Sequence, residues 1–230
     1  MTPQDALKQH AAVAAIRKLP LRGVIGLGTG STAEFFIERL AALIQQEGRE
    51  FVGVPTSDRS RTFAQSRGIP VLDEHGPWEI DVTVDGADEV SDNLDLIKGG
   101  GACHLREKII NDASKTNIII VDESKLSCHL GMRSAVPVEV VRFGHAAVAS
   151  KLRHFGEVRL RLHAGQPVVT DSGHLIYDLR GGMIADPRVL DIALSQIPGV
   201  VETGLFVGRA SLVIVASPDG ARELSPSQRA

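Results

Sequence analysis

Apolar residues recur at helical spacing in the segment STAEFFIERLAALIQ, where they occupy positions 33, 36, 37, 40, 43 and 44. Residues three and four apart share one face of a helix, so this segment is predicted to be amphipathic. The short apolar run GVIGL, residues 23–27, precedes it and leads into glycines. The pattern predicts a strand, a tight loop and a helix, and Ser31 followed by Glu34 matches the capping box of a helix start.

Other apolar runs in the first half of the chain are short enough to be buried strands. These predicted strands are 51–54, 69–72, 80–84 and 117–121. Helical patterns or loops near 58–67 and 102–114 separate them. Alternation of strands with helices is typical of a parallel sheet covered by helices. The fold class predicted for this part is α/β, with an open, mostly parallel, Rossmann-like sheet.

The pattern changes after about residue 130. The segments that follow read β-α-β-β-α-β, the order of a ferredoxin-like unit: PVEVV, HAAVASKLRHF, EVRLRLH, PVVTDSGHLIYDL, PRVLDIALSQI and GVVETGLF. The strand SLVIVA, 211–216, then needs a sheet to join, and the open edge of the first domain offers one. We therefore predict a large α/β domain, 1–130 plus 206–230, and a smaller ferredoxin-like α+β domain, 131–205, inserted near the C-terminus.

Charge and composition narrow the classes of partner. The 230 residues carry 25 lysines and arginines against 28 aspartates and glutamates, a formal charge of −3, which gives no general attraction to nucleic acid or to an anionic membrane. Cys103 and Cys128 match neither a zinc motif nor a secreted disulfide framework, and the N-terminus lacks the apolar core of a signal peptide. No apolar run approaches the roughly 18 residues of a membrane helix. We expect a soluble, cytoplasmic protein that binds neither nucleic acid nor membrane.

The loop GLGTGST, residues 26–32, lies where a strand leads to a helix N-terminus. Glycines permit a close approach of the backbone and the helix dipole favours an anion, so a phosphate would fit at this loop. A tight turn that only caps the helix is the alternative. A dinucleotide site is disfavoured, because the G-x-G-x-x-G pattern needs glycine where Ser31 stands and no persuasive acid follows at the ribose-binding distance.

Two carboxylates follow the predicted strand 80–84. Asp85 and Asp88 would lie in the loop at the carboxyl end of that strand, which is where open α/β sheets place ligands. A DGAD turn without a function is the alternative. The acids that come next are interpreted as solvated loop charges: Glu89, Asp92 and Asp95.

The segment KGGG, residues 98–101, has three consecutive glycines, which cost conformational entropy when they are ordered. Something must approach their backbone closely, or the loop must move. Lys125, in VDESK after the strand 117–121, is a second lysine at the carboxyl end of a predicted strand. An ordinary exposed lysine is the alternative at that position.

The predicted helix after KGGG has Glu107 at the margin of one apolar face, which is formed by Ala102, Leu105, Ile109 and Ala113. A carboxylate that is partly desolvated at such a margin would be suited to proton transfer. The alternative is a surface helix on which Glu107 is one charge among several.

Together these segments supply a phosphate loop, two loop carboxylates, two lysines and a glutamate on a helix. Such a set could bind a sugar phosphate, polarise its oxygens and move a proton between adjacent carbons. The sequence shows no tight cluster of metal ligands, and its eight histidines are scattered without an H-E-x-x-H partner. The histidines His104, His163 and His174 are therefore interpreted as surface or structural residues.

Short motifs stand in a fixed order along the chain: GLGTGST at 26–32, PTSDRS at 55–60, DGADE at 85–89, KGGGACHLREK at 98–108, DESK at 122–125, PVEV at 137–140, TDSGHLIYD at 170–178 and GVVETGLF at 199–206. In this order and spacing they resemble the type A ribose-5-phosphate isomerases, over nearly the whole chain. Each motif alone is weak, but their joint order is specific to that family.

The resemblance implies an enzyme that interconverts D-ribose 5-phosphate and D-ribulose 5-phosphate in the non-oxidative pentose phosphate pathway, without metal or other cofactor. It implies a homodimer and makes Glu107 the proton-transferring residue. The substrate-binding residues that it implies are Thr29, Gly30, Ser31, Thr32, Asp85, Gly86, Ala87, Asp88, Lys98, Gly99, Gly100, Gly101 and Lys125. We further expect Asp85 and Asp88 to position or protonate sugar oxygens during ring opening, and Lys98 to stabilise the enediolate.

The chain departs from the family pattern at Cys103 and His104, where small or apolar residues are usual, and at His174, where asparagine is frequent. None of these replaces a residue with an implied role. Two other functions on the same fold remain open. One is a non-catalytic sugar-phosphate sensor, although no basic or helix-turn-helix segment precedes residue 20 to support it. The other is an amino-sugar phosphate isomerase/deaminase.

Overall fold

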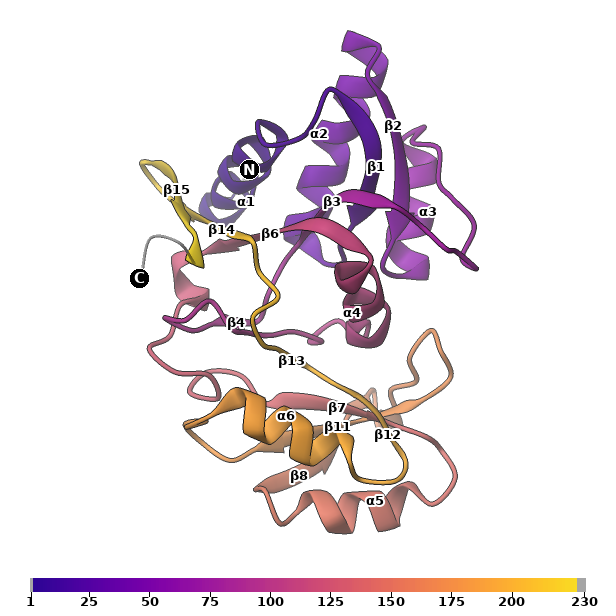
Figure 1. The fold of residues 1–230 in the computed structure, drawn as a ribbon, viewed down its shortest axis with the longest axis vertical. Coiled ribbons are helices and arrows are strands. Elements are labelled where there is room, and N and C mark those ends of the chain that lie inside the picture. Colours follow the sequence, from indigo (N-terminus) through magenta and orange to yellow (C-terminus); the bar gives the residue numbers. More distant parts are fainter. Residues whose placement is uncertain (1, 227–230) are drawn as a thin grey trace. The chain divides into compact units, whose positions relative to one another are not determined.

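The computed structural model describes residues 2–226, which form two compact units (Figure 1). The first unit contains the described residues within 1–86, 106–124 and 209–230, and the second contains 87–105 and 125–208. The predicted domains, 1–130 plus 206–230 and 131–205, remain a prediction. The compact units differ from them mainly by grouping 87–105 with the second unit.

The first unit is built on a six-stranded sheet of order β15-β14-β6-β3-β1-β2. Neighbouring strands are parallel, except for β14 and β15, so the predicted open and mostly parallel sheet is confirmed. The strands are β1 (Arg22–Leu27), β2 (Glu50–Pro55), β3 (Ile80–Asp85), β6 (Ser114–Asp122), β14 (Leu212–Ser217) and β15 (Gly220–Leu224). The segment SLVIVA joins this sheet as β14 beside β6, as expected.

The predicted strand 69–72 is wrong. In this segment Val71 forms only an isolated bridge to Gly53 of β2. Pro70 has no backbone N–H to donate to a neighbouring strand, so the pairing does not extend into a ladder. The segment lies along the edge strand β2 without becoming a strand of the sheet.

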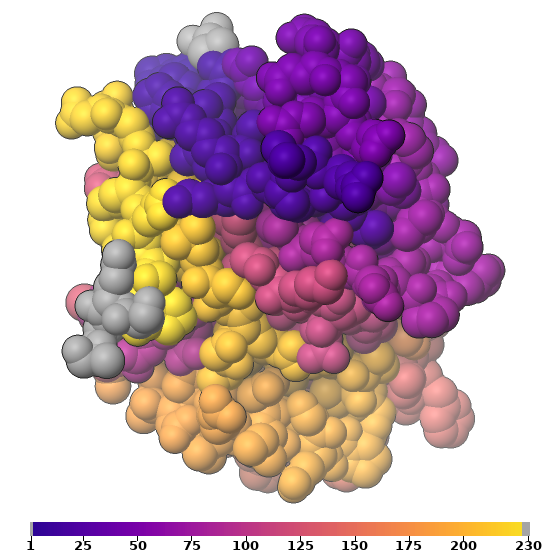
Figure 2. Space-filling model, turned by 45° about the horizontal axis from the view of Figure 1, so that its top comes forward, coloured from indigo at the N-terminus to yellow at the C-terminus, as the bar shows by residue number. Residues whose placement is uncertain are grey.

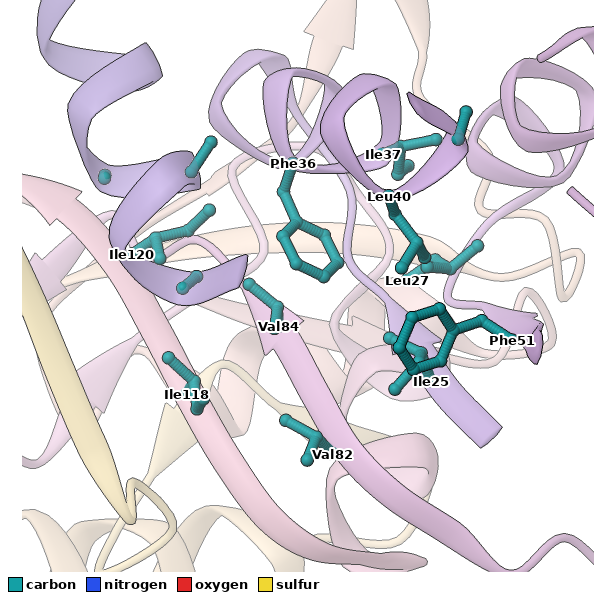
Figure 3. Close-up of a cluster of buried hydrophobic side chains, with 14 of the residues drawn as sticks. Ile25, Leu27, Phe36, Ile37, Leu40, Phe51, Val82, Val84, Ile118 and Ile120 are labelled. Carbon is teal, nitrogen blue, oxygen red and sulfur yellow. The ribbon is translucent and has the colours of Figure 1, made fainter. Parts of the chain in front are cut away.

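The helices of the first unit are α1 (Pro3–Ile16), α2 (Ser31–Glu47), α3 (Asp58–Ser66) and most of α4 (His104–Asp112), followed by the short 3₁₀ helix η1 (Glu123–Lys125). The amphipathic pattern of α2 is confirmed, because its apolar face packs on the sheet (Figure 3). Large side chains of this core include Ile25, Leu27, Phe36, Ile37, Leu40 and Phe51. Full burial of each such side chain contributes about 1.5–3 kcal/mol to folding.

Helix α1 lies beside the carboxyl-terminal strands, as the adjoining indigo and yellow surfaces of Figure 2 show. It begins with a capping box in which the Thr2 hydroxyl accepts a hydrogen bond from the Asp5 N–H, and the Asp5 carboxylate accepts one from the Thr2 N–H. Farther along, Lys18 pairs with Glu223 of β15 at 2.7 Å. None of the described helices is long and apolar enough to cross a membrane.

The second unit is built on an antiparallel sheet of order β12-β7-β11-β8. Its elements are β7 (Val136–Val140), α5 (His145–Leu152), β8 (Glu157–Leu160), β11 (Leu175–Arg180), α6 (Pro187–Ser195) and β12 (Val200–Thr203). This is the predicted β-α-β-β-α-β order, with the first strand between the last and the third. The ferredoxin-like unit is therefore confirmed.

Two small sheets complete the second unit. One has the order β13-β5-β4 and the other is a hairpin of β9 and β10. Their strands are β4 (Glu89–Val90), β5 (Leu96–Ile97), β13 (Leu205–Phe206), β9 (Leu162–His163) and β10 (Gln166–Pro167). Strands this short give a weak sequence pattern, and the first three were not predicted as separate elements. The small β4-β5-β13 sheet fixes the segment that leads into KGGG, because β5 ends immediately before Lys98.

Candidate active site

The strand order of the first unit reverses between β1 and β3, because the chain runs from β1 to β2 on one side and returns to β3 on the other. Open α/β sheets bind ligands outside the carboxyl ends of their strands at such a point. The loop after β1 carries Thr29 and Gly30, and β3 ends at Asp85. The fold therefore brings the predicted phosphate loop and one predicted carboxylate to the same edge.

Asp85 and the loop after β1 are joined by hydrogen bonds. The Asp85 carboxylate is buried and accepts the backbone N–H of Thr29 at 3.1 Å and that of Gly86 at 2.7 Å. A Cβ atom added to Gly28 would lie 2.2 Å from Asp85 Oδ1 and 2.6 Å from its Cα. Glycine is required at position 28 because the carboxylate packs directly against its backbone.

A cluster of hydroxyl groups holds the same loop from the side of β2. The Thr29 hydroxyl lies 2.7 Å from those of Thr56 and Ser57, and 3.0 Å from that of Ser60. Ser60 in turn donates to the Gly28 carbonyl at 2.7 Å. We did not single out these hydroxyl residues from the sequence. The PTSDRS motif that contains them was the available signal.

The predicted capping box at Ser31 is wrong. Gly30, with φ of 105°, is the N-cap of α2, and Ser31 is already the first helical residue. The Glu34 side chain pairs with Arg59 at 2.7 Å. The first N–H groups of α2 thus have no side-chain cap from Gly30, and the positive end of the helix favours an anion.

Helix α4 buries a polar stripe, so the predicted apolar face is wrong. Its buried polar side chains follow helical spacing at His104, Glu107, Lys108 and Asn111. Ile110 is buried beside them, whereas Ile109 is 49% exposed. A hydrophobicity pattern cannot identify a buried stripe that is polar. Glu107 is 5% exposed, which is inconsistent with the alternative of an ordinary surface charge.

The part of α4 in the first unit is positioned by the sheet. The side chain of Ile110 lies over Gly26 of β1, where an added Cβ would come within 3.0 Å of it. At the end of the helix, the Asn111 carbonyl accepts the Asn117 side-chain amide at 2.9 Å. The helix that carries Glu107 is therefore fixed on the face of the sheet opposite α2.

In the second unit Glu89 is fully buried, so its interpretation as a solvated charge is wrong. Its carboxylate accepts four backbone N–H groups at 3.0–3.1 Å, from Gly131, Met132, Arg133 and Ser134. Such a set of donors satisfies a buried carboxylate without a cation. Glu89 thus anchors the segment 131–134 beside Asp88, whose carbonyl accepts the Ser134 hydroxyl at 3.4 Å.

The glycines of KGGG are approached closely by two side chains of the second unit. Asp88 accepts the Gly100 N–H at 2.7 Å, and a Cβ on Gly100 would lie 2.6 Å from that carboxylate. Gly99 has φ of 103°, and a Cβ there would lie 2.7 Å from the ring of His104. The predicted close approach to this backbone is confirmed, and it comes from the protein itself.

A cavity of about 460 Å³ in the second unit brings several predicted residues together. Its lining includes Asp88, Gly100 and Lys125, together with Arg133 and Arg161. Lys98 is buried, and its ammonium lies 5.5 Å from the centroid of the Phe206 ring. The second unit therefore offers a basic cavity whose lining also includes two carboxylates, Asp88 and Asp178.

The interpretation of the histidines is confirmed. His163 is exposed, whereas His104 and His174 both lie against the buried carboxylate of Glu139, at 3.7 and 3.0 Å. Burial raises the pKa of Glu139 above its ordinary value, and hydrogen bonds from Thr170 and His174 oppose that shift. No three His, Cys, Asp or Glu side chains in residues 2–226 are grouped so as to hold a metal ion.

The fold and these loops define an α/β protein whose glycine-rich loops, buried carboxylates and lysines suit a small anionic ligand. The family model described as ribose 5-phosphate isomerase A (phosphoriboisomerase A) matches residues 52–220. The chain belongs to this family, and the resemblance inferred from its motifs is confirmed.

Individual relatives match the chain over nearly its full length. Ribose-5-phosphate isomerase A of Desulfatibacillum aliphaticivorans is 48% identical over 227 residues, which are 97% of this chain and 99% of the relative. The solved structure of the Methanocaldococcus jannaschii isomerase is 38% identical, with a TM-score of 0.91 over 96% of this chain and 98% of that one. A solved D-ribose-5-phosphate isomerase in complex with phospho-erythronic acid is 39% identical, with a TM-score of 0.93 over 98% and 100%.

Proposed function

We propose that this protein is an aldose-ketose isomerase that interconverts D-ribose 5-phosphate and D-ribulose 5-phosphate in the non-oxidative pentose phosphate pathway. The observation that carries the proposal is the full-length similarity to ribose-5-phosphate isomerase A, with the implied residues present at their positions. One relative of known structure binds phospho-erythronic acid, a phosphorylated sugar acid, which supports a sugar phosphate as the ligand of this chain.

Glu107 is the proposed base. It takes the proton from C2 of the open-chain aldose and returns it to C1 of the enediolate, which yields the ketose without net loss of a proton. Its burial on α4 supports this role, since a carboxylate shielded from water is better matched to carbon-acid chemistry than a solvated one.

Asp85 and Asp88 are proposed to position or protonate the sugar oxygens during ring opening. The hydrogen bonds that Asp85 accepts from Thr29 and Gly86 fix its direction, and Asp88 is fixed by Gly100. Lys98 is proposed to stabilise the negative charge of the enediolate, because a preorganised cation costs no reorganisation when that charge develops.

The loop residues Thr29 to Thr32 are proposed to bind the phosphate through the N-terminus of α2. Gly86, Ala87 and the KGGG glycines are proposed to line the sugar with their backbone. The N–H groups of Gly86 and Gly100 donate to Asp85 and Asp88 and so hold these two carboxylates in place. Lys125 is proposed as a further substrate ligand, supported by its place in the lining of the basic cavity of the second unit. The chemistry needs neither metal nor organic cofactor.

The proposed setting is the cytoplasm, with the enzyme acting as a homodimer and binding neither nucleic acid nor membrane. The formal charge of −3 supports the absence of a general attraction to polyanions. Neither cysteine is part of a disulfide among the described residues, as is usual in a reducing compartment.

The experiment is to mix the purified protein with D-ribose 5-phosphate and to follow formation of ketose. Turnover to D-ribulose 5-phosphate supports the proposal. Tight binding without turnover would identify the sensor alternative, and release of ammonia from glucosamine 6-phosphate would identify the deaminase.

A further inference from the structure

Arg161 holds the backbone of KGGG by two of its carbonyl groups. Its Nη1 donates to the Gly99 carbonyl at 2.6 Å and to the Gly100 carbonyl at 3.3 Å. The other side of the guanidinium faces Asp178, whose two carboxylate oxygens accept from Nε at 3.0 Å and from Nη2. The guanidinium of Arg161 is thus hydrogen-bonded on both sides, to the glycine carbonyls and to Asp178. The Arg161 side chain is 17% exposed.

Arg161 and Asp178 are both positioned by the sheet of the second unit. Arg161 follows β8, and its N–H donates to the Ile176 carbonyl of β11 at 2.9 Å. Asp178 lies on β11 in a register that pairs it with Arg159 of β8. A side chain fixed by regular strands holds its position better than one on a loop. The flexible glycines are therefore held by a rigid part of the fold.

The direction of the loop amides follows from peptide planarity. The carbonyl of one residue and the N–H of the next point in opposite directions. When Arg161 draws the Gly99 carbonyl to one side, the Gly100 N–H points to the other, where Asp88 accepts it at 2.7 Å. The same relation directs the Gly101 N–H away from Arg161. Arg161 and Asp88 thus hold one glycine peptide from both sides.

We propose that Arg161, oriented by Asp178, is a positioning residue that sets the direction of the KGGG amides. Three consecutive glycines have little conformational preference of their own, so their order depends on such contacts. The catalytic consequence rests on the proposed isomerase function, because it requires that KGGG binds the sugar. The ordering of the KGGG loop by Arg161 does not depend on that proposed function.

Two substitutions separate the charge of Arg161 from the planar geometry of its guanidinium. Arg161→Met keeps the length of the side chain but removes the charge and the fork. Arg161→Lys keeps the charge but cannot bridge Asp178 and Gly99 with a planar group. Arg142→Met is the matched control, since Arg142 also donates to a glycine carbonyl of the second unit, that of Gly173 at 3.0 Å.

The first measurement is hydrogen exchange at the Gly100 amide in the protein without substrate. We expect exchange to be at least about tenfold faster in Arg161→Met, because local opening exposes an amide whose partners are no longer fixed. Arg161→Lys should restore only part of the protection, and Arg142→Met should leave it unchanged. Unchanged exchange in Arg161→Met, or full protection in Arg161→Lys, would overturn the positioning role. The exchange measurement does not depend on whether the protein is an active isomerase.

The second measurement is the steady-state kinetics of ribose 5-phosphate turnover. We expect Arg161→Met to lose about 10–100-fold, carried by kcat more than by KM, because misplaced groups lose transition-state contacts. Arg142→Met should match the parent. If exchange is faster but kcat is unchanged in an active enzyme, the catalytic part of the inference is wrong. A parent without turnover would refute the proposed function and leave the exchange result standing.

Discussion

The Asp85 carboxylate accepts a hydrogen bond from the Thr29 N–H at 3.1 Å, and this bond ties the end of β3 to the glycine-rich loop after β1. This hydrogen bond thus holds together two segments that are 56 residues apart in the sequence. Because the carboxylate lies against Gly28, the loop and the acid constrain each other.

Gly28→Ala should lower the free energy of unfolding by about 1–3 kcal/mol, as overpacking does in tight interiors. The added Cβ would lie 2.6 Å from backbone of Asp85, which cannot move like the end of a long side chain. Gly86→Ala is the control, because the nearest atom to its Cβ is 3.9 Å away. Urea denaturation of both variants checks this, and equal stability for the two would contradict the steric argument.

Lys98→Met should lower kcat/KM by about 10²–10³-fold, the range found when one donor to a developing oxyanion is removed. Methionine keeps most of the apolar length of the side chain, so the fold should be retained although the ammonium over the Phe206 ring is lost. Lys115→Met, which removes an exposed lysine paired with Asp81, is the control. Steady-state kinetics with ribose 5-phosphate decide the matter, and parent-like efficiency in Lys98→Met would remove Lys98 from the site.

Glu139 should make the second unit less stable as the pH rises. Burial raises its folded-state pKa above the ordinary value of 4.5, so the folded state holds the proton more tightly than the unfolded state. The stability this contributes is fully present below pH 4.5 and is lost as the pH rises through the raised pKa. The charged or titratable neighbours that face it are His104, His174 and Glu202.

The test compares the parent with Glu139→Gln in urea denaturation across acidic to neutral pH. The free energy of unfolding of the parent should fall relative to that of Glu139→Gln as the pH rises. Glu157→Gln, which changes an exposed acid of β8, should show no such trend. A parent that gains stability relative to Glu139→Gln over this range would show the opposite sign and refute the assignment.

The sequence could predict the fold where side chains follow a regular apolar pattern. Phe36, Ile37 and Leu40 repeat at helical spacing and are buried on the sheet, so the pattern and the packing express the same geometry. The order of strands and helices likewise gave the ferredoxin-like unit. The motifs also gave the glycine loops, because glycine is required where a carboxylate or a ring approaches the backbone, as at Gly28 and Gly99.

The sequence could not predict buried polar groups, because their partners are distant backbone atoms. Glu89 looks like a loop charge, yet it accepts four N–H groups from residues 131–134. On α4 the buried stripe is polar and Ile109 is exposed, so hydrophobicity gave the wrong face. Arg161 was not singled out either, since an arginine after a strand reveals nothing about the carbonyls it will reach.

Treatment with EDTA should leave isomerase activity unchanged. The proposed chemistry uses a carboxylate base and lysine charge, so it needs no metal to polarise the sugar. Assays before and after exhaustive chelation, with a divalent ion added back, check this. Loss of turnover that one divalent ion restores would contradict the metal-independent mechanism.

The proton-transfer role of Glu107 is the central claim, and Glu107→Gln tests it because glutamine keeps the shape of the side chain but cannot accept the proton. Folding and sugar-phosphate affinity should be nearly retained. Removal of a positioned general base costs about 10²–10⁴-fold in rate.

The most direct measurement is exchange of the C2 hydrogen of ribose 5-phosphate with deuterated solvent, followed together with ketose formation in the parent and in Glu107→Gln. We predict that both rates fall together by that factor, because one residue serves both steps. If exchange persists while isomerisation fails, another group removes the C2 proton. If both rates stay within about tenfold of the parent, a barrier change of roughly 1.4 kcal/mol, Glu107 is not the base.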